Sequence, residues 1–144
     1  MGNSADNPNV FRQRLPATPP SIALFRSGLR HWLEDLNVDP AQIFDIVLAC
    51  SESLTLVIED SPRQVALVVD VEAALDGDRL TLTTRDYGLW HETHAHHNGD
   101  EPLGLALMRA MMDTVEHERH ADGQRITLSK RVAVAAGAPR ANAH

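Results

Sequence analysis

The stretch DPAQIFDIVLACSESLTLVIEDSP, residues 39–62, decides the fold of this chain. Asp39 and Pro40 suit a helix start, because aspartate can cap free backbone N–H groups and proline fits the first turn. Gln42 occupies the reach-back position of a capping box, and Ser61-Pro62 ends the helix. Apolar side chains follow at helical spacing: Ile43, Ile46, Val47, Cys50, Leu54, Val57 and Ile58. The stretch therefore predicts a long core helix, with Glu52 on a different face from this stripe.

A second helix is expected before this one. Thr18-Pro19-Pro20 predicts its start, with Thr18 as the capping residue. Its apolar stripe comprises Ile22, Phe25, Leu29, Trp32, Leu33 and Leu36, and Asn37 ends it. Residues 10–15 predict a short edge strand that Pro16 ends, and residues 1–8 are expected to be a disordered leader.

After residue 62 the sequence alternates with period two, returns to helical spacing, and alternates again. The expected elements are a strand at 65–71, a turn at 76–78, a strand at 80–84, a polar loop at 87–102, a helix at 103–113, a strand at 115–120, a turn at 122–123 and a strand at 125–131. Residues 133–144 are rich in alanine and are expected to form a flexible tail. One domain over residues 9–132 is the resulting prediction.

The order of these elements indicates the fold class. Helices and strands cluster rather than alternate strictly, which favours an α+β two-layer sandwich over a doubly wound sheet. We expect a mixed, mostly antiparallel sheet with three helices packed on one face.

The composition argues against several classes of protein. The chain has 144 residues and a net charge of -7, from 13 basic and 20 acidic side chains, which argues against direct nucleic-acid binding. A single cysteine, Cys50, excludes a disulfide framework within the chain and suits a reducing cytoplasm. The polar N-terminus is unlike a signal peptide, and no stretch is expected to approach the ~20 apolar residues that span a membrane.

Three segments stand out, which we call boxes 1, 2 and 3. Box 1 is Ala49–Leu56 around Glu52, box 2 is Thr83–Trp90 with Asp86-Tyr87-Gly88, and box 3 is Glu101–Met108 with Gly104-Leu105. In this order they resemble the nucleotide-contacting boxes of the GHKL ATPase/kinase superfamily, in particular its RsbW/SpoIIAB-type anti-sigma-factor serine kinases. The resemblance covers roughly residues 9–132.

The resemblance implies a role for individual residues and for ATP and Mg²⁺ as cofactors. Glu52 would be the catalytic base, and Asp86 would accept a hydrogen bond from the adenine amine. Gly88 and Gly104 would let the backbone approach the nucleotide closely. Leu105 and Thr127 complete the expected cofactor-binding set.

Three positions depart from the family pattern. Leu56 stands where the family has the asparagine that holds Mg²⁺, and a leucine offers this hard ion no oxygen ligand. Pro102 replaces a glycine of box 3 and removes one backbone N–H, and Trp90 replaces the last glycine of box 2. Taken alone, box 1 favours an ordinary core helix with Glu52 on its solvated side.

The functional hypothesis is a homodimeric anti-sigma-like regulator that binds ATP, holds a sigma factor, and phosphorylates a serine of a STAS-domain antagonist. The alternative is a catalytically inactive module of the same fold that sequesters a protein partner. A third reading is a metal sensor built on the loop histidines His91, His94, His96 and His97, although the sequence assigns no metal site there. His117 and His120 are expected to be exposed on the outer side of their strand.

Overall fold

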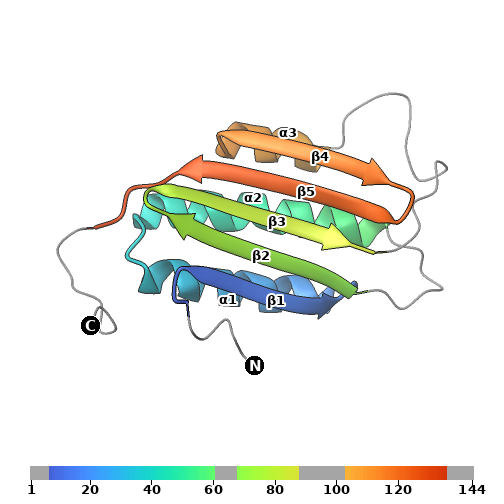
Figure 1. Ribbon diagram of the computed structural model, residues 1–144, viewed down its shortest axis with the longest axis horizontal. Helices are drawn as coiled ribbons and strands as arrows, with labels where there is room; N and C mark the ends of the chain where they lie inside the picture. Colours follow the sequence, from blue (N-terminus) through green and yellow to red (C-terminus); the bar gives the residue numbers. More distant parts are fainter. Residues whose placement is uncertain (1–6, 61–67, 88–102, 136–144) are drawn as a thin grey trace.

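The computed structural model describes residues 7–60, 68–87 and 103–135 (Figure 1). The elements are β1 Val10–Pro16, α1 Pro20–Asp35, α2 Pro40–Asp60, β2 Val68–Asp76, β3 Arg79–Asp86, α3 Leu103–Met111, β4 Thr114–His120 and β5 Gly123–Arg131. The strands form one five-stranded sheet in the order β1-β2-β3-β5-β4. All three helices lie on the same face of this sheet (Figure 1). The predicted α+β two-layer sandwich is confirmed.

The sheet is antiparallel at every pairing among the described strands, so the expectation of a mixed sheet was wrong. Two described helices separate β1 from β2, and the chain reverses direction three times: from β1 to α1, from α1 to α2, and from α2 to β2. β2 therefore runs antiparallel to β1 (Figure 1). A single helix separates β3 from β4, which makes these two strands parallel. β5 lies between them and pairs with both, so no parallel neighbours arise.

The hydrophobic core lies between the sheet and α2, which contacts α1, α3, β3 and β5. Its fully buried side chains include Phe25 and Leu29 from α1, Ile46 and Leu54 from α2, and Leu82 from β3. Contrary to the expectation from the sequence, one stretch is long and apolar enough for a membrane span, namely Pro40–Glu59 with a mean hydropathy of 1.6. That helix is α2, and 61% of its most apolar window is buried inside the fold, which accounts for its composition.

The helix starts are only partly as predicted. Pro19, in the helical conformation, caps α1, and no side chain supplies a capping hydrogen bond, so Thr18 does not have the expected role. Asp39 does cap α2, because its Oδ2 accepts a hydrogen bond from the backbone N–H of Gln42 at 3.3 Å. The Gln42 side chain does not reach back to this cap. It holds the end of β5 instead, accepting from the N–H of Ala133 at 2.7 Å and donating to the Arg131 carbonyl.

The face of the sheet that the helices leave open carries polar side chains. Arg14 donates two hydrogen bonds to Asp70, at 2.7 and 2.9 Å, and the Tyr87 hydroxyl donates to the same carboxylate at 2.7 Å. Hydrogen bonds from Arg14 lower the pKa of Asp70, and the bond to Asp70 raises the pKa of Tyr87. The guanidinium of Arg85 lies 4.8 Å from the centre of the Tyr87 ring. These contacts fix the end of β3, where box 2 begins.

Candidate functional site

Asp86 ends β3 on the helix-covered side of the sheet and is only 5% exposed. Its Oδ1 accepts a hydrogen bond from the backbone N–H of Gln124 at 3.2 Å. Its Oδ2 accepts another from the Gln124 side-chain Nε2 at 3.4 Å. Box 2 therefore presents a buried carboxylate that the start of β5 holds in place.

Gly123 allows this approach between β3 and β5. Its φ is +142°, a conformation that side chains with a Cβ rarely adopt. A Cβ at this position would lie 2.2 Å from the backbone oxygen of Asp86 and 2.9 Å from its Oδ1. Sequence reasoning treated Asp122-Gly123 only as a turn and missed this contact. No local sequence pattern indicates this contact, because it depends on the strand register that places Gly123 beside Asp86.

Boxes 1 and 3 meet where α2 contacts α3. A Cβ on Gly104 would lie 3.1 Å from Oε1 of Glu52, so the glycine leaves room for the carboxylate beside the first turn of α3. The free backbone N–H groups and positive dipole end of a helix favour a negative group there. The structure thus places Glu52 beside Gly104.

A buried hydrogen bond links box 1 to the strand that carries box 2. The hydroxyls of Ser53 and Thr84 lie 3.0 Å apart, and the Ser53 hydroxyl also donates to the Cys50 carbonyl at 2.7 Å. Because a serine hydroxyl has one proton, Thr84 donates to Ser53. Ser53 follows Glu52 in α2, and Thr84 precedes Asp86 by two residues on the same face of β3. The described parts of the three boxes therefore lie toward the same end of the sandwich (Figure 1).

Among the expected cofactor-binding residues, Thr127 lies on the opposite face of the sheet, and Leu105 follows Gly104 in α3 with its side chain buried in the core. Thr127 pairs with Thr83 and Glu116, and these positions face the open side of the sheet, away from Asp86. Side chains alternate between the two faces of a strand, and Gln124 and Ile126 of β5 face the helices. Thr127 therefore faces the other side of the sheet. Leu105 is 4% exposed and packs in the core, so its side chain holds α3 rather than a ligand. Gly88 lies outside the described residues.

Leu56 offers no ligand atom to a metal ion in box 1. It is 7% exposed and belongs to the hydrophobic core, so hydrocarbon fills the position where the family has a Mg²⁺-binding asparagine. Thr55 is half-buried and Glu59 is exposed one turn after Thr55. The residues present do not reproduce the family's metal ligand. No cluster of three or more potential metal ligands occurs in residues 7–60, 68–87 and 103–135.

The cysteine and histidines have contrasting positions. Burial raises the pKa of the Cys50 thiol, and this side chain packs in the core. His120 is exposed, as expected. His117 was expected on the outer side, but it faces the helices, is half-buried, and lies 2.8 Å from the side-chain oxygen of Gln124. The loop histidines, Trp90 and Pro102 lie outside the described residues.

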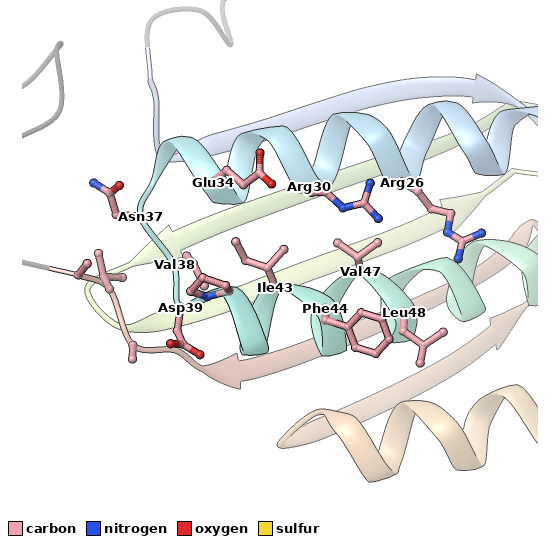
Figure 2. A pocket seen from close by; sticks show the side chains of 14 residues that line it. Arg26, Arg30, Glu34, Asn37, Val38, Asp39, Ile43, Phe44, Val47 and Leu48 are labelled. Carbon is pink, nitrogen blue, oxygen red and sulfur yellow. The ribbon is translucent and has the colours of Figure 1, made fainter. Parts of the chain in front are cut away.

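A separate cavity of about 650 Å³ lies between α1 and the N-terminal half of α2 (Figure 2). The Arg26 and Arg30 side chains extend from α1 along one wall, and Phe44 and Leu48 extend from α2 (Figure 2). Phe44 is 68% exposed, an unusual position for so large an apolar side chain. The segment that follows β5 closes one end, where Val134 bridges to Val38. This groove is distinct from the end of the sandwich where the boxes meet.

Residues 15–130 match the family described as Histidine kinase-like ATPase domain, and the chain belongs to this family. Among solved structures it resembles "The crystal structure of the RsbU and RsbW domains of Rv1364c from Mycobacterium tuberculosis", with 28% sequence identity and a TM-score of 0.69. The match covers 88% of this chain but only 33% of that one. The fold, the family and this likeness together identify a GHKL domain of the RsbW type.

Proposed function

We propose that this chain is a regulatory protein of the anti-sigma type that binds ATP at the end of the sandwich formed by the three boxes. The observation that carries the proposal is the buried Asp86 carboxylate, held by Gln124 and approached by Gly123. An ionised carboxylate only accepts hydrogen bonds, so it suits the exocyclic amine of adenine. The start of α3, beside Gly104, offers backbone N–H groups to the phosphates.

In this proposal Glu52 acts on a protein substrate. Its carboxylate would take the proton of a serine hydroxyl while the serine oxygen forms a bond to the γ-phosphorus of ATP, and ADP leaves. The serine would belong to a STAS-domain antagonist, and the regulated partner would be a sigma factor. A phosphate added to the antagonist would alter its binding, because it carries nearly two negative charges at neutral pH.

Two measurements test the two parts of this proposal, ATP binding and phosphoryl transfer. Isothermal titration of the full chain with ATP, in Mg²⁺ and in EDTA, measures binding. Incubation with γ-labelled ATP and a purified STAS-domain antagonist measures transfer to serine. ATP binding with transfer that Glu52→Gln abolishes supports the kinase, and absence of ATP binding in both buffers rejects the proposed site.

Leu56 favours a second candidate function, a binding module without catalysis. Phosphoryl transfer depends strongly on a cation that neutralises the phosphates, and box 1 lacks the oxygen that the family uses to hold it. In this case the chain would sequester its partner whether or not nucleotide is bound. ATP binding with no transfer to the antagonist is the expected result.

The groove between α1 and α2 suits the protein partner that either function requires. Its apolar floor and the exposed Phe44 offer contacts to the apolar face of a helix, as in other helix-in-groove complexes. Arg26 and Arg30 are exposed along one wall, although the chain as a whole is acidic. We therefore assign the groove to a helical segment of a partner protein that is acidic on the side facing these arginines.

A charge and contact test separates this surface from the nucleotide site. Phe44→Ser and Arg30→Glu should each weaken binding of a purified sigma-factor partner about tenfold or more, with ATP affinity unchanged. Tyr87→Phe, on the open face of the sheet, serves as the control. Unchanged partner affinity in both groove variants would remove this assignment. Homodimerisation and a cytoplasmic location remain predictions.

A further inference from the structure

We infer that Gln124, held by His117, is the positioning residue that makes Asp86 selective for 6-aminopurines over 6-oxopurines. This inference rests on the proposed nucleotide site and extends it to residues outside the three boxes. The two residues, His117 on β4 and Gln124 on β5, are brought together by the register between these strands.

Gln124 controls both oxygens of the Asp86 carboxylate. Its backbone N–H donates to Oδ1 at 3.2 Å and its side-chain Nε2 donates to Oδ2 at 3.4 Å. Gln124 is only 1% exposed, so the amide has almost no access to water. Hydrogen bonds donated to a carboxylate favour its charged form. One residue therefore both orients the carboxylate and keeps it an acceptor.

The Asp86 carboxylate fixes which way the Gln124 amide points, and His117 binds the other end of the amide. If the amide were turned over, its oxygen would face the carboxylate, and two acceptors would then meet. With the NH₂ toward Asp86, the Oε1 of Gln124 lies 2.8 Å from Nε2 of His117, and the imidazole donates to it from Nε2. The chain of contacts runs from His117 through Gln124 to Asp86.

The result is a fixed acceptor that cannot readily adapt to another base. The ionised carboxylate of Asp86 only accepts hydrogen bonds. A 6-amino group can donate to such an acceptor, whereas a 6-oxo group would face it with a lone pair. Gly123 adds to the rigidity, since its backbone lies against Asp86 too closely for a Cβ. A ligand that leaves a buried polar group of the site unpaired can be bound much more weakly than one that pairs with it.

The first experiment compares nucleotides in the full chain. ATP, ITP and purine riboside triphosphate, which lacks any 6-substituent, are titrated against wild type, Gln124→Leu and His117→Ala. We expect Gln124→Leu to weaken ATP about tenfold and to leave the purine analogue within about twofold, and wild type to prefer ATP over ITP. His117→Ala should show the same pattern at about threefold. Gln42→Leu, another glutamine that holds backbone groups, is the matched control.

The second experiment needs no nucleotide and covers variants that bind poorly. The Asp86 carboxyl carbon is followed by NMR during an acid titration in wild type and in both variants. Its midpoint should move to higher pH in Gln124→Leu and, less, in His117→Ala. Equal losses for ATP and the purine analogue, or an unmoved midpoint, would overturn the inference. If wild type binds no purine nucleotide, the proposed function and the selectivity fail together. If ATP binds but neither the nucleotide pattern nor the shift of the midpoint is seen, only the inference fails.

Discussion

The two halves of the candidate site differ in how completely they are built. Where β3 meets β5, the carboxylate of Asp86 is buried, both its oxygens accept hydrogen bonds, and a glycine is shaped to it. Where α2 meets α3, Glu52 lies beside Gly104, but Leu56 fills the position of the family's metal ligand with hydrocarbon. The first half has the groups that the proposed base recognition needs, and the second lacks a metal ligand that the proposed phosphoryl transfer needs.

In the proposed function, binding and catalysis would depend on separate elements of the same fold. Base recognition would rely on strand register, which the hydrogen bonds of the whole sheet maintain. Catalysis would rely on one face of α2, where Leu56 stands in place of a metal ligand. The proposal therefore allows catalysis to be lost while the proposed adenine site is retained.

Gly123→Ala should have the largest effect, because the new side chain would displace Asp86 in the half of the site around β3 and β5. The new Cβ would lie 2.2 Å from a backbone oxygen, and φ at this position is +142°. We expect a loss of about 3 kcal/mol or more in the free energy of unfolding, and no detectable ATP binding. Urea denaturation and titration measure the two effects.

Gly77→Ala is the matched control for that variant. Gly77 also has positive φ, at +64°, but no atom lies within 4 Å of a Cβ built there. Its cost should be only about 1 kcal/mol, with ATP affinity retained. Similar costs for the two variants would show that the contact with Asp86 is unimportant.

Asp86→Asn and Glu52→Gln sharpen the comparison between the halves. Removing the charge at Asp86 should weaken ATP binding about ten- to a hundredfold, the usual effect of losing a hydrogen bond to a charged group. Glu52→Gln should change ATP affinity less than about threefold, because its proposed role is in transfer. Isothermal titration of both variants suffices. The reverse order of effects would exchange the roles of the two halves.

Leu56→Asn tests whether the incomplete half can be restored. The new amide oxygen should make ATP binding about threefold or more stronger in Mg²⁺ than in EDTA. Since Leu56 is 7% exposed, the same change should cost about 2–3 kcal/mol of stability. Leu56→Ala provides the control, with a similar loss of stability and no gain from Mg²⁺. An affinity that ignores Mg²⁺ in Leu56→Asn would count against the alignment of box 1.

The smallest expected effect lies on the open face of the sheet, away from both halves. The folded pKa of Asp70 is lowered, chiefly by hydrogen bonds from Arg14, so its contribution is present above the unfolded pKa of about 3.9 and is lost as pH falls through the folded value. Asp70→Asn should therefore lower stability slightly at pH 7 and by less at pH 2. Thermal unfolding at both values measures this. Glu72→Gln, whose partner Arg12 is equally exposed, should have a smaller effect. A destabilisation equal at both pH values would show that the charge of Asp70 is not its cause.

Much of the fold follows from periodicity alone. The apolar stripes of α1 and α2 and the period-two strands gave the element order and the two layers. The sequence could not show that β5 inserts between β3 and β4, and this insertion makes the sheet fully antiparallel. It also could not show that Gln42 holds the end of β5, since that contact joins residues far apart in the chain.

The candidate site was less predictable, for a related reason. Glu52, Asp86 and Gly104 lie in short local patterns, so they could be found by reading along the chain. Gly123, Gln124 and His117 matter only because register places them beside Asp86. Thr127 was expected from the resemblance, and the pleat of β5 turns it to the opposite face.

Isothermal titration of wild type with ATP and ADP, in Mg²⁺ and in EDTA, tests the central claim most directly. The claim is that the half around Asp86 binds adenine nucleotide while the half around Leu56 holds no Mg²⁺. Both nucleotides should bind, with affinities that differ less than about threefold between the two buffers. Failure of both to bind, or ATP binding only in Mg²⁺, would contradict it.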